Sequence, residues 1–110
     1  MDKIKLRREL LEGMCICAEY IDEVYYLGGM ITGVDFYNSE CPEPFKPGVA
    51  DKYMFNRIIE ANIDIIIKEL EIKNITNPKM IGAQLMIKHY YPQYGKWRVM
   101  PKLSWKQIWG

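Results

Sequence analysis

After Glu71 the chain has no acidic residue, although the segment 72–110 is 39 residues long and carries seven Lys and Arg residues. The whole chain of 110 residues still has a net charge of only +1. Residues 1–50 hold five Lys and Arg against nine Asp and Glu, a balance of −4, and residues 51–110 hold ten against five, a balance of +5. This distribution predicts a dipolar molecule whose basic end meets an anionic partner.

Cysteine is scarce, and long apolar runs are absent. Three cysteines, an odd number, favour a reducing, cytoplasmic location over a disulfide-stabilised secreted fold. The basic N-terminus reaches Glu9 and Glu12 before any long apolar run, so no secretory signal is expected. A membrane span needs ~20 apolar residues, so we also expect no membrane contact. With 49% hydrophobic and 26% charged residues, the chain is expected to fold as a single domain, 1–110.

The few potential metal ligands do not form a metal or catalytic motif. Cys15, Cys17, Cys41 and His89 are the four candidates for zinc. Residues two apart on a helix point about 200° apart, so Cys15 and Cys17 cannot both reach one ion; Cys17 is interpreted as a core residue and Cys15 as incidental. His89, beside Tyr90 in a basic segment, is interpreted as part of a polar surface. No nucleophile–base pair or carboxylate pair is indicated, so we expect a protein that is not an enzyme and has no cofactor or metal.

The first predicted helix covers the segment from Asp2 to Leu27. Its apolar residues recur at intervals of four and three, which places them on one face of a helix. Gly13 lies within this segment and indicates either a kink or a close contact with another helix. The residues of the apolar stripe are Leu10, Met14, Cys17, Ile21 and Val24.

A second helix is predicted over Val49–Ile72. The stripe Met54, Ile58, Ala61 and Ile65, ending at Leu70 or Ile72, has further isoleucines on the neighbouring faces. Because so wide an apolar surface must be covered on more than one side, we expect this helix to be central.

Two structures compete for the region after Asn77-Pro78, which is itself a typical helix start. A helix through Met80, Ala83, Ile87 and Tyr90 would end at Pro92. The alternative pairs Leu85–Tyr91 with Lys96–Met100 as a hairpin around Pro-Gln-Tyr-Gly. Further along, Ser104 is predicted to cap a last helical turn through Ile108.

The remaining segments complete a mainly α fold of about three helices. Met30–Asn38 is interpreted as a short strand or an extended loop, and Ser39–Gly48, with three prolines, as a stiff loop. The expected fold is thus a single compact domain with a short extended or hairpin element.

The C-terminal third combines cations with aromatic rings, and this combination is typical of surfaces that bind nucleic acid. We therefore predict a small non-catalytic protein that binds nucleic acid or a protein that handles nucleic acid. In this interpretation the Lys and Arg residues contact phosphates and the rings stack on bases. The predicted binding residues are Lys88, Tyr94, Lys96, Trp97, Arg98, Lys102, Trp105 and Lys106.

Other interpretations of the same residues remain open at this stage. The aromatic rings also suit the closing of a small core, and the acidic first helix could pair with the basic end. A different function is a helical, self-associating protein-interaction module or inhibitor that sequesters a host protein, encoded by a phage or another mobile element. Its support is the apolar width of the first two helices, which exceeds what a helix pair alone would hide.

Overall fold

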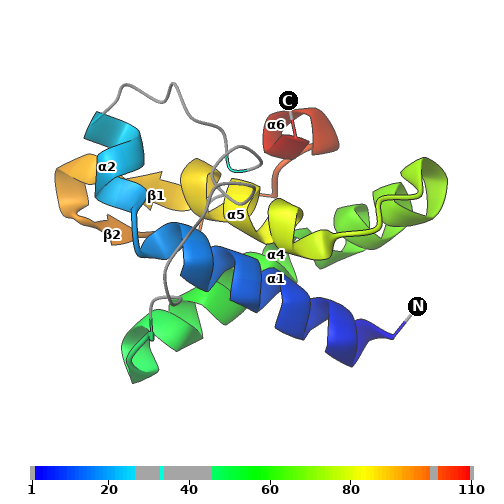
Figure 1. Ribbon diagram of the computed structural model, residues 1–110, viewed down its shortest axis with the longest axis horizontal. Helices are drawn as coiled ribbons and strands as arrows, with labels where there is room; N and C mark the ends of the chain where they lie inside the picture. The colour runs from blue at the N-terminus through cyan, green and yellow to red at the C-terminus, as the bar shows by residue number, and fades with distance from the viewer. Residues whose placement is uncertain (1, 27–32, 34–45, 100–101, 110) are drawn as a thin grey trace.

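The computed structural model describes residues 2–26, 33, 46–99 and 102–109 (Figure 1). This part of the chain forms a mainly α domain with a short antiparallel hairpin, which confirms the predicted fold class. The predicted strand Met30–Asn38 lies outside the described residues apart from Gly33, as does the predicted loop Ser39–Gly48 apart from residues 46–48. The elements are α1 (Lys3–Ala18), α2 (Ile21–Tyr26), α4 (Val49–Lys73), α5 (Pro78–His89), β1 (Tyr90–Tyr91), η1 (Pro92–Tyr94), β2 (Lys96–Trp97) and α6 (Trp105–Trp109).

The N-terminal segment is two helices rather than the single helix predicted. The stripe from Leu10 to Val24 is buried throughout, as expected from its spacing. However, α1 ends at Ala18 and α2 begins only at Ile21, with a turn between them in which the Tyr20 amide bonds the Cys17 carbonyl at 3.0 Å. The turn lets α2 meet the hairpin, where the Tyr90 hydroxyl donates a hydrogen bond to Asp22.

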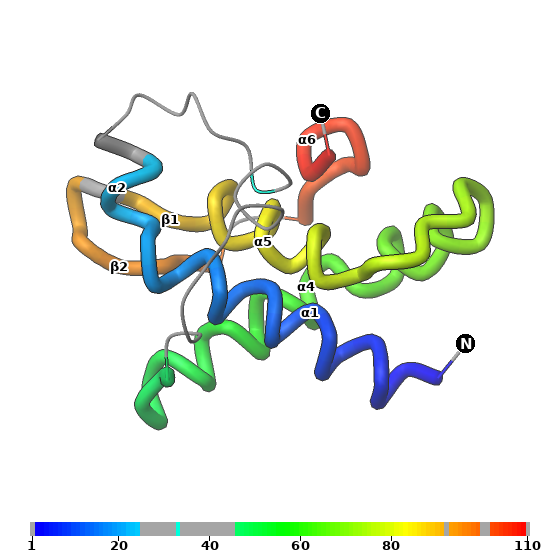
Figure 2. Tube along the Cα trace, in the orientation of Figure 1, coloured from blue at the N-terminus to red at the C-terminus, as the bar shows by residue number. Residues whose placement is uncertain are grey.

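The central helix is α5, not the predicted Val49–Ile72 helix. Every residue from 81 to 86 is buried, because α5 contacts α1, α4 and α6 (Figure 1). The α1–α5 crossing is especially close, and Figure 2 shows the first half of α5 lying against α1. A Cβ added at Gly13 would overlap the Lys79 carbonyl oxygen, and one added at Gly82 would overlap the Leu10 carbonyl oxygen. Gly13 therefore marks a close helix contact, one of the two roles predicted for it.

Helix α4 has nearly the predicted bounds, but of the predicted stripe it buries only Ile58 and Leu70. Met54, Ala61 and Ile65 of the predicted stripe are only half-buried, and Ile72 is 65% exposed. The face that packs on the core includes a polar residue, Asn62, which explains why apolar spacing alone misplaced it. The buried residues of α4 are Phe55, Ile58, Ile59, Asn62, Ile63, Ile66 and Leu70. None of the helices that the structure describes combines the length and apolar character required to cross a membrane.

The helix and the hairpin predicted as alternatives after Asn77 both exist, one after the other. The Asn77 side chain accepts a hydrogen bond from the Lys79 amide at 3.3 Å, and Pro78 opens α5, as predicted. The helix ends at His89, and β1 then pairs with β2 in the register Tyr90–Trp97. Gly95 permits the turn between them, since its φ of +61° lies in the left-handed region.

The predicted last turn is confirmed as α6. The Ser104 hydroxyl accepts from the Gln107 amide at 3.2 Å, and the Gln107 side chain accepts from the Ser104 amide at 2.8 Å. This reciprocal pair is a capping box, which satisfies two amides at the start of a helix. Leu103 and Ile108 are buried and anchor the segment on the core.

Candidate functional site

The hairpin presents a cationic and aromatic surface, which we call the hairpin face: Tyr94, Lys96 and Arg98. All three side chains are exposed, with Tyr94 55% exposed. The Arg98 guanidinium carbon lies 4.1 Å from the centre of the Tyr94 ring, well within the range of a cation–π contact. The contact holds a charged group and a flat ring together at the surface, with the guanidinium over one face of the ring.

Strand geometry explains why these side chains point outward. Successive side chains of a strand alternate between its two faces, so Trp97 points opposite to Lys96 and Arg98. The Trp97 ring packs edge-on against Phe55 of α4, with ring centres 5.0 Å apart, and lies 5.7 Å from the Tyr90 ring. Trp97 therefore fixes the hairpin on the core and is only half-buried.

The second group of predicted residues belongs to the segment around α6. Lys102 and Lys106 are exposed, and Trp105 is half-buried. The Trp105 ring stacks on Trp109 with centres 5.7 Å apart and planes 12° apart. Both indoles also pack against the core, so this pair closes the core and exposes only part of its rings.

The predicted residues thus occupy two regions of the molecule. In Figure 1 the hairpin lies at the left end, whereas α6 lies to the right of it, beyond α5. Lys88, which is exposed, stands near the end of α5, just before the hairpin. The hairpin face and the α6 segment would reach one ligand together only if that ligand were extended.

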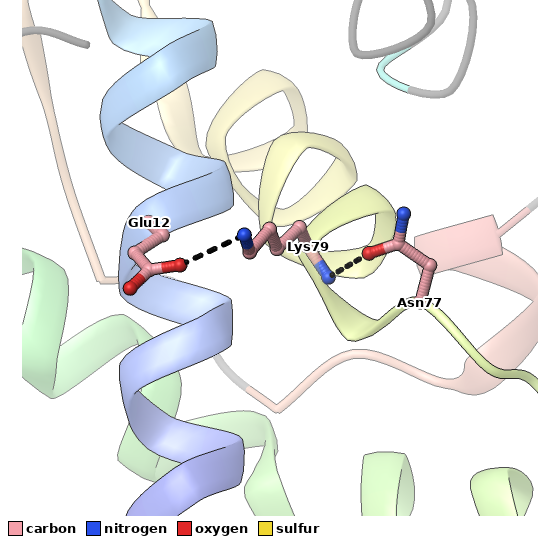
Figure 3. A network of polar contacts seen from close by, with 3 residues as sticks. All are labelled: Glu12, Asn77 and Lys79. Atoms are coloured by element: carbon pink, nitrogen blue, oxygen red, sulfur yellow. Dashed lines mark hydrogen bonds and ion pairs between the residues drawn. The ribbon is translucent and has the colours of Figure 1, made fainter.

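The acidic N-terminal helices do not neutralise the predicted cations. Within the described residues, none of the five predicted Lys and Arg residues forms an ion pair. The α1 carboxylate of Glu12 pairs instead with Lys79 at 3.1 Å, at the start of α5 (Figure 3). Of the interpretation in which the first helix pairs with the basic end, the described residues therefore support one ion pair, that of Glu12 with Lys79.

A groove beside the hairpin was not anticipated from the sequence. It has a volume of about 420 Å³ and lies between α4 and the residue that follows Arg98, Val99. In its wall the Arg57 guanidinium lies over the ring of Tyr53, 5.9 Å from the ring centre, and Tyr53 is 63% exposed. The spacing of four between Tyr53 and Arg57 could have indicated this pair. The lining residues are Tyr53, Asn56, Arg57, Glu60, Ala61 and Val99.

His89 is buried, so its assignment to a polar surface was wrong. It has no exposed surface, and its Nδ1 lies 2.8 Å from the Leu85 carbonyl. Since a carbonyl only accepts, Nδ1 carries the proton, and Nε2 accepts from the Asn62 amide nitrogen at 3.5 Å. Burial lowers the pKa of His89, although the Leu85 hydrogen bond opposes the shift, so the ring is neutral.

The neutral His89 gives a pH prediction. The pKa of His89 in the folded protein is below its unfolded value of 6.5. The contribution of the neutral ring to the free energy of unfolding is therefore complete above pH 6.5, and it declines as the pH falls through 6.5 toward the folded pKa. Urea unfolding at pH 7.5 and 5.5 should show a loss of about 1 kcal/mol from this residue. Asparagine does not titrate between pH 7.5 and 5.5. In His89→Asn the loss of unfolding free energy over this range should therefore be smaller, because only the carboxyl groups still contribute to it. An equal loss in both proteins would contradict the assignment.

Two of the three cysteines, Cys15 and Cys17, are packing residues, as predicted for Cys17, and Cys41 lies outside the described residues. Cys15 and Cys17 are both buried, and burial raises the pKa of the Cys15 thiol to about 11, with Glu12 adding to the shift and Lys52 opposing it. A thiol with so high a pKa is a weak nucleophile at neutral pH. Among the residues that the structure describes, no three His, Cys, Asp or Glu side chains are grouped to hold a metal.

Comparisons with known proteins found no family model, no curated protein and no solved structure that matches this chain.

Proposed function

We propose that this protein is a non-catalytic binder of nucleic acid that makes its main contact through the hairpin face. Lys96 and Arg98 would contact phosphates, and the exposed Tyr94 ring would stack on a base. The observation that carries the proposal is the Arg98–Tyr94 pair, an exposed cation over an exposed ring, in a region where the cations have no carboxylate partner within the described residues. Lys88, Lys102 and Lys106 would add phosphate contacts along an extended ligand.

Charge reversal of the hairpin face tests the proposal. The double variant Lys96→Glu and Arg98→Glu should bind DNA or RNA at least about tenfold more weakly at low salt, because two phosphate contacts become repulsive. The slope of log affinity against log salt concentration is negative, and it should become less negative by about 2 when two phosphate contacts are lost. Fluorescence anisotropy with labelled oligonucleotides between 20 and 200 mM salt would measure both.

The matched control places the same change in charge elsewhere. Lys68 and Lys73 are exposed on the second half of α4, whose C-terminal end lies at the opposite side of the molecule from the hairpin (Figure 1). Lys68→Glu with Lys73→Glu should leave the affinity within about threefold, since long-range charge effects are screened beyond ~10 Å at 0.1 M salt. If neither single- nor double-stranded DNA or RNA binds the unmodified protein at low salt, direct contact is excluded.

Self-association remains a prediction without a specific observation in its favour. The apolar width of α1 and α4 that suggested it is covered in part by α5, α6 and the hairpin. Among the described residues, the large aliphatic side chains that stay exposed are Ile4, Val49 and Ile72, which belong to different parts of α1 and α4. Light scattering at tens of micromolar protein would show whether the chain is a monomer.

A further inference from the structure

Two tyrosine–arginine pairs with the same spacing lie near one another on the surface. Tyr53 and Arg57 are four residues apart on α4, and Tyr94 and Arg98 are four apart across the end of the hairpin. In each pair the guanidinium lies over the ring, at 5.9 Å and 4.1 Å from its centre. Both tyrosines are more than half exposed, at 63% for Tyr53 and 55% for Tyr94. Each pair therefore offers a π-face and a positive charge together.

The groove connects the two pairs. Val99 lines it together with Tyr53 and Arg57, and Val99 is the neighbour of Arg98 in the chain. The packing of Trp97 on Phe55 holds this strand against the same half of α4. The groove thus begins at the residue that follows the hairpin face in the chain.

The charges of the groove suit an anionic ligand. Arg57 faces it, and Arg98 stands beside it. Glu60 is the acidic residue of the lining, and its carboxylate is paired with Arg7 of α1, which offsets its charge. Asn56 adds an amide that can both donate and accept hydrogen bonds.

From these features we infer that the ligand is a single-stranded nucleic acid, whose bases stack on Tyr94 and Tyr53 while its backbone passes Arg98 and Arg57 along the groove. The inference rests on the proposed function and specifies its ligand class and path. Exposed rings beside cations bind unpaired bases without regard to sequence, because every base has a π-face. In a duplex those faces are covered by neighbouring base pairs.

The shapes of the elements also disfavour a duplex. Reading a major groove requires a helix or a two-stranded ribbon that enters it. The hairpin strands have only two residues each. The long helix α4 exposes Asp64 and Glu71 beyond the groove, and these carboxylates would repel the phosphates of a duplex laid along the helix.

The test compares ligands first. A labelled 20-nucleotide oligo(dT) and an oligo(U) of the same length should bind at least about tenfold more tightly than a 20-base-pair duplex, because only unpaired bases can stack on the rings. Poly-glutamate of similar length supplies negative charge without bases and should bind at least about tenfold more weakly than oligo(dT). Equal affinity for the duplex, or for poly-glutamate, would overturn the inference.

Substitutions of Tyr53 then test the path. Tyr53→Ala should weaken oligo(dT) binding about fivefold or more, the effect of losing one stacked base. Tyr53→Phe keeps the ring and should bind like the unmodified protein. Because Tyr53 is largely exposed, both variants should keep the far-UV circular dichroism and melting temperature of the parent.

The outcomes separate this inference from the proposed function. If Lys96→Glu with Arg98→Glu abolishes binding while Tyr53→Ala changes nothing, the path over α4 is wrong and the hairpin face still binds nucleic acid. If no oligonucleotide binds the unmodified protein, both fail. Loss in Tyr53→Ala with retention in Tyr53→Phe supports the inference.

Discussion

Gly13→Ala and Gly82→Ala should each lower the melting temperature by about 10 °C. An added methyl group would overlap the Lys79 carbonyl oxygen in the first variant and the Leu10 carbonyl oxygen in the second. Backbone atoms cannot rotate away as a side chain does, so α1 and α5 must separate. Overpacking of this kind costs about 1–3 kcal/mol and occasionally more. In a domain of this size 1 kcal/mol corresponds to roughly 4–8 °C.

The expected loss exceeds the opposing gain in helix propensity. Alanine is better than glycine in a helix interior by up to about 1 kcal/mol, so a site with open space would be stabilised. The matched control is Gly48→Ala, since a Cβ at Gly48 meets nothing within 4 Å. Gly48 is the N-cap of α4, where alanine is mildly unfavourable, so a change of about 1 kcal/mol or less is expected. The melting temperatures of all three variants can be measured by thermal unfolding. An unchanged melting temperature in Gly13→Ala and Gly82→Ala would show that α1 and α5 are not in such close contact.

Asn62→Ala should lower the free energy of unfolding by about 3 kcal/mol. The Asn62 side chain has no exposed surface and donates to the Ile58 carbonyl at 2.9 Å. Its oxygen accepts from the Leu103 amide at 3.3 Å, and its nitrogen faces His89. Without it, the buried Leu103 amide and the His89 ring nitrogen lose their partner, and each unsatisfied buried group costs about 1–3 kcal/mol.

The same substitution on the exposed side of α4 provides the control. Asn56→Ala removes the same atoms from the same helix, but Asn56 is exposed, so the free energy of unfolding should stay within about 0.5 kcal/mol. Hydrogen exchange gives a second measurement. The Leu103 amide should lose protection in Asn62→Ala and keep it in Asn56→Ala. Unchanged protection of Leu103 in Asn62→Ala would contradict the role of this hydrogen bond in holding the segment that leads to α6.

Local signals in the sequence were sufficient to locate most helices. Asn77-Pro78 and Ser104 mark helix starts because their side chains and ring geometry act on amides only two or three residues away. The apolar spacing of residues 10–24 likewise identified a buried face, since that pattern depends on the helix alone. The break at Glu19–Tyr20 was missed because no glycine or proline causes it. It accompanies the contact between Asp22 and Tyr90, which are 68 residues apart.

The buried faces of α4 and α5 depend on residues that are distant in the sequence, so local patterns could not predict them. Asn62 and His89 were not expected in the core, since an isolated polar residue is normally placed toward solvent. They are buried because each satisfies the other across 27 residues of sequence, and Leu103 is joined to Asn62 across 41. The apolar stripe of α4 was consequently only partly correct, with Ile58 and Leu70 buried, and α5 was not recognised as the central helix.

The sequence by itself determined the bounds of α4, the starts of α5 and α6, and the collection of positive charge after Glu71. Tertiary structure alone decided which helix is central, that the predicted basic residues divide between the hairpin face and the α6 segment, and that Tyr53 and Arg57 line a groove together with Val99. The reason is the range of the interactions. Caps and periodicity act within a few residues, whereas the glycine contacts between α1 and α5, the Asn62–His89 pair and the packing of Trp97 on Phe55 join residues that only folding brings together.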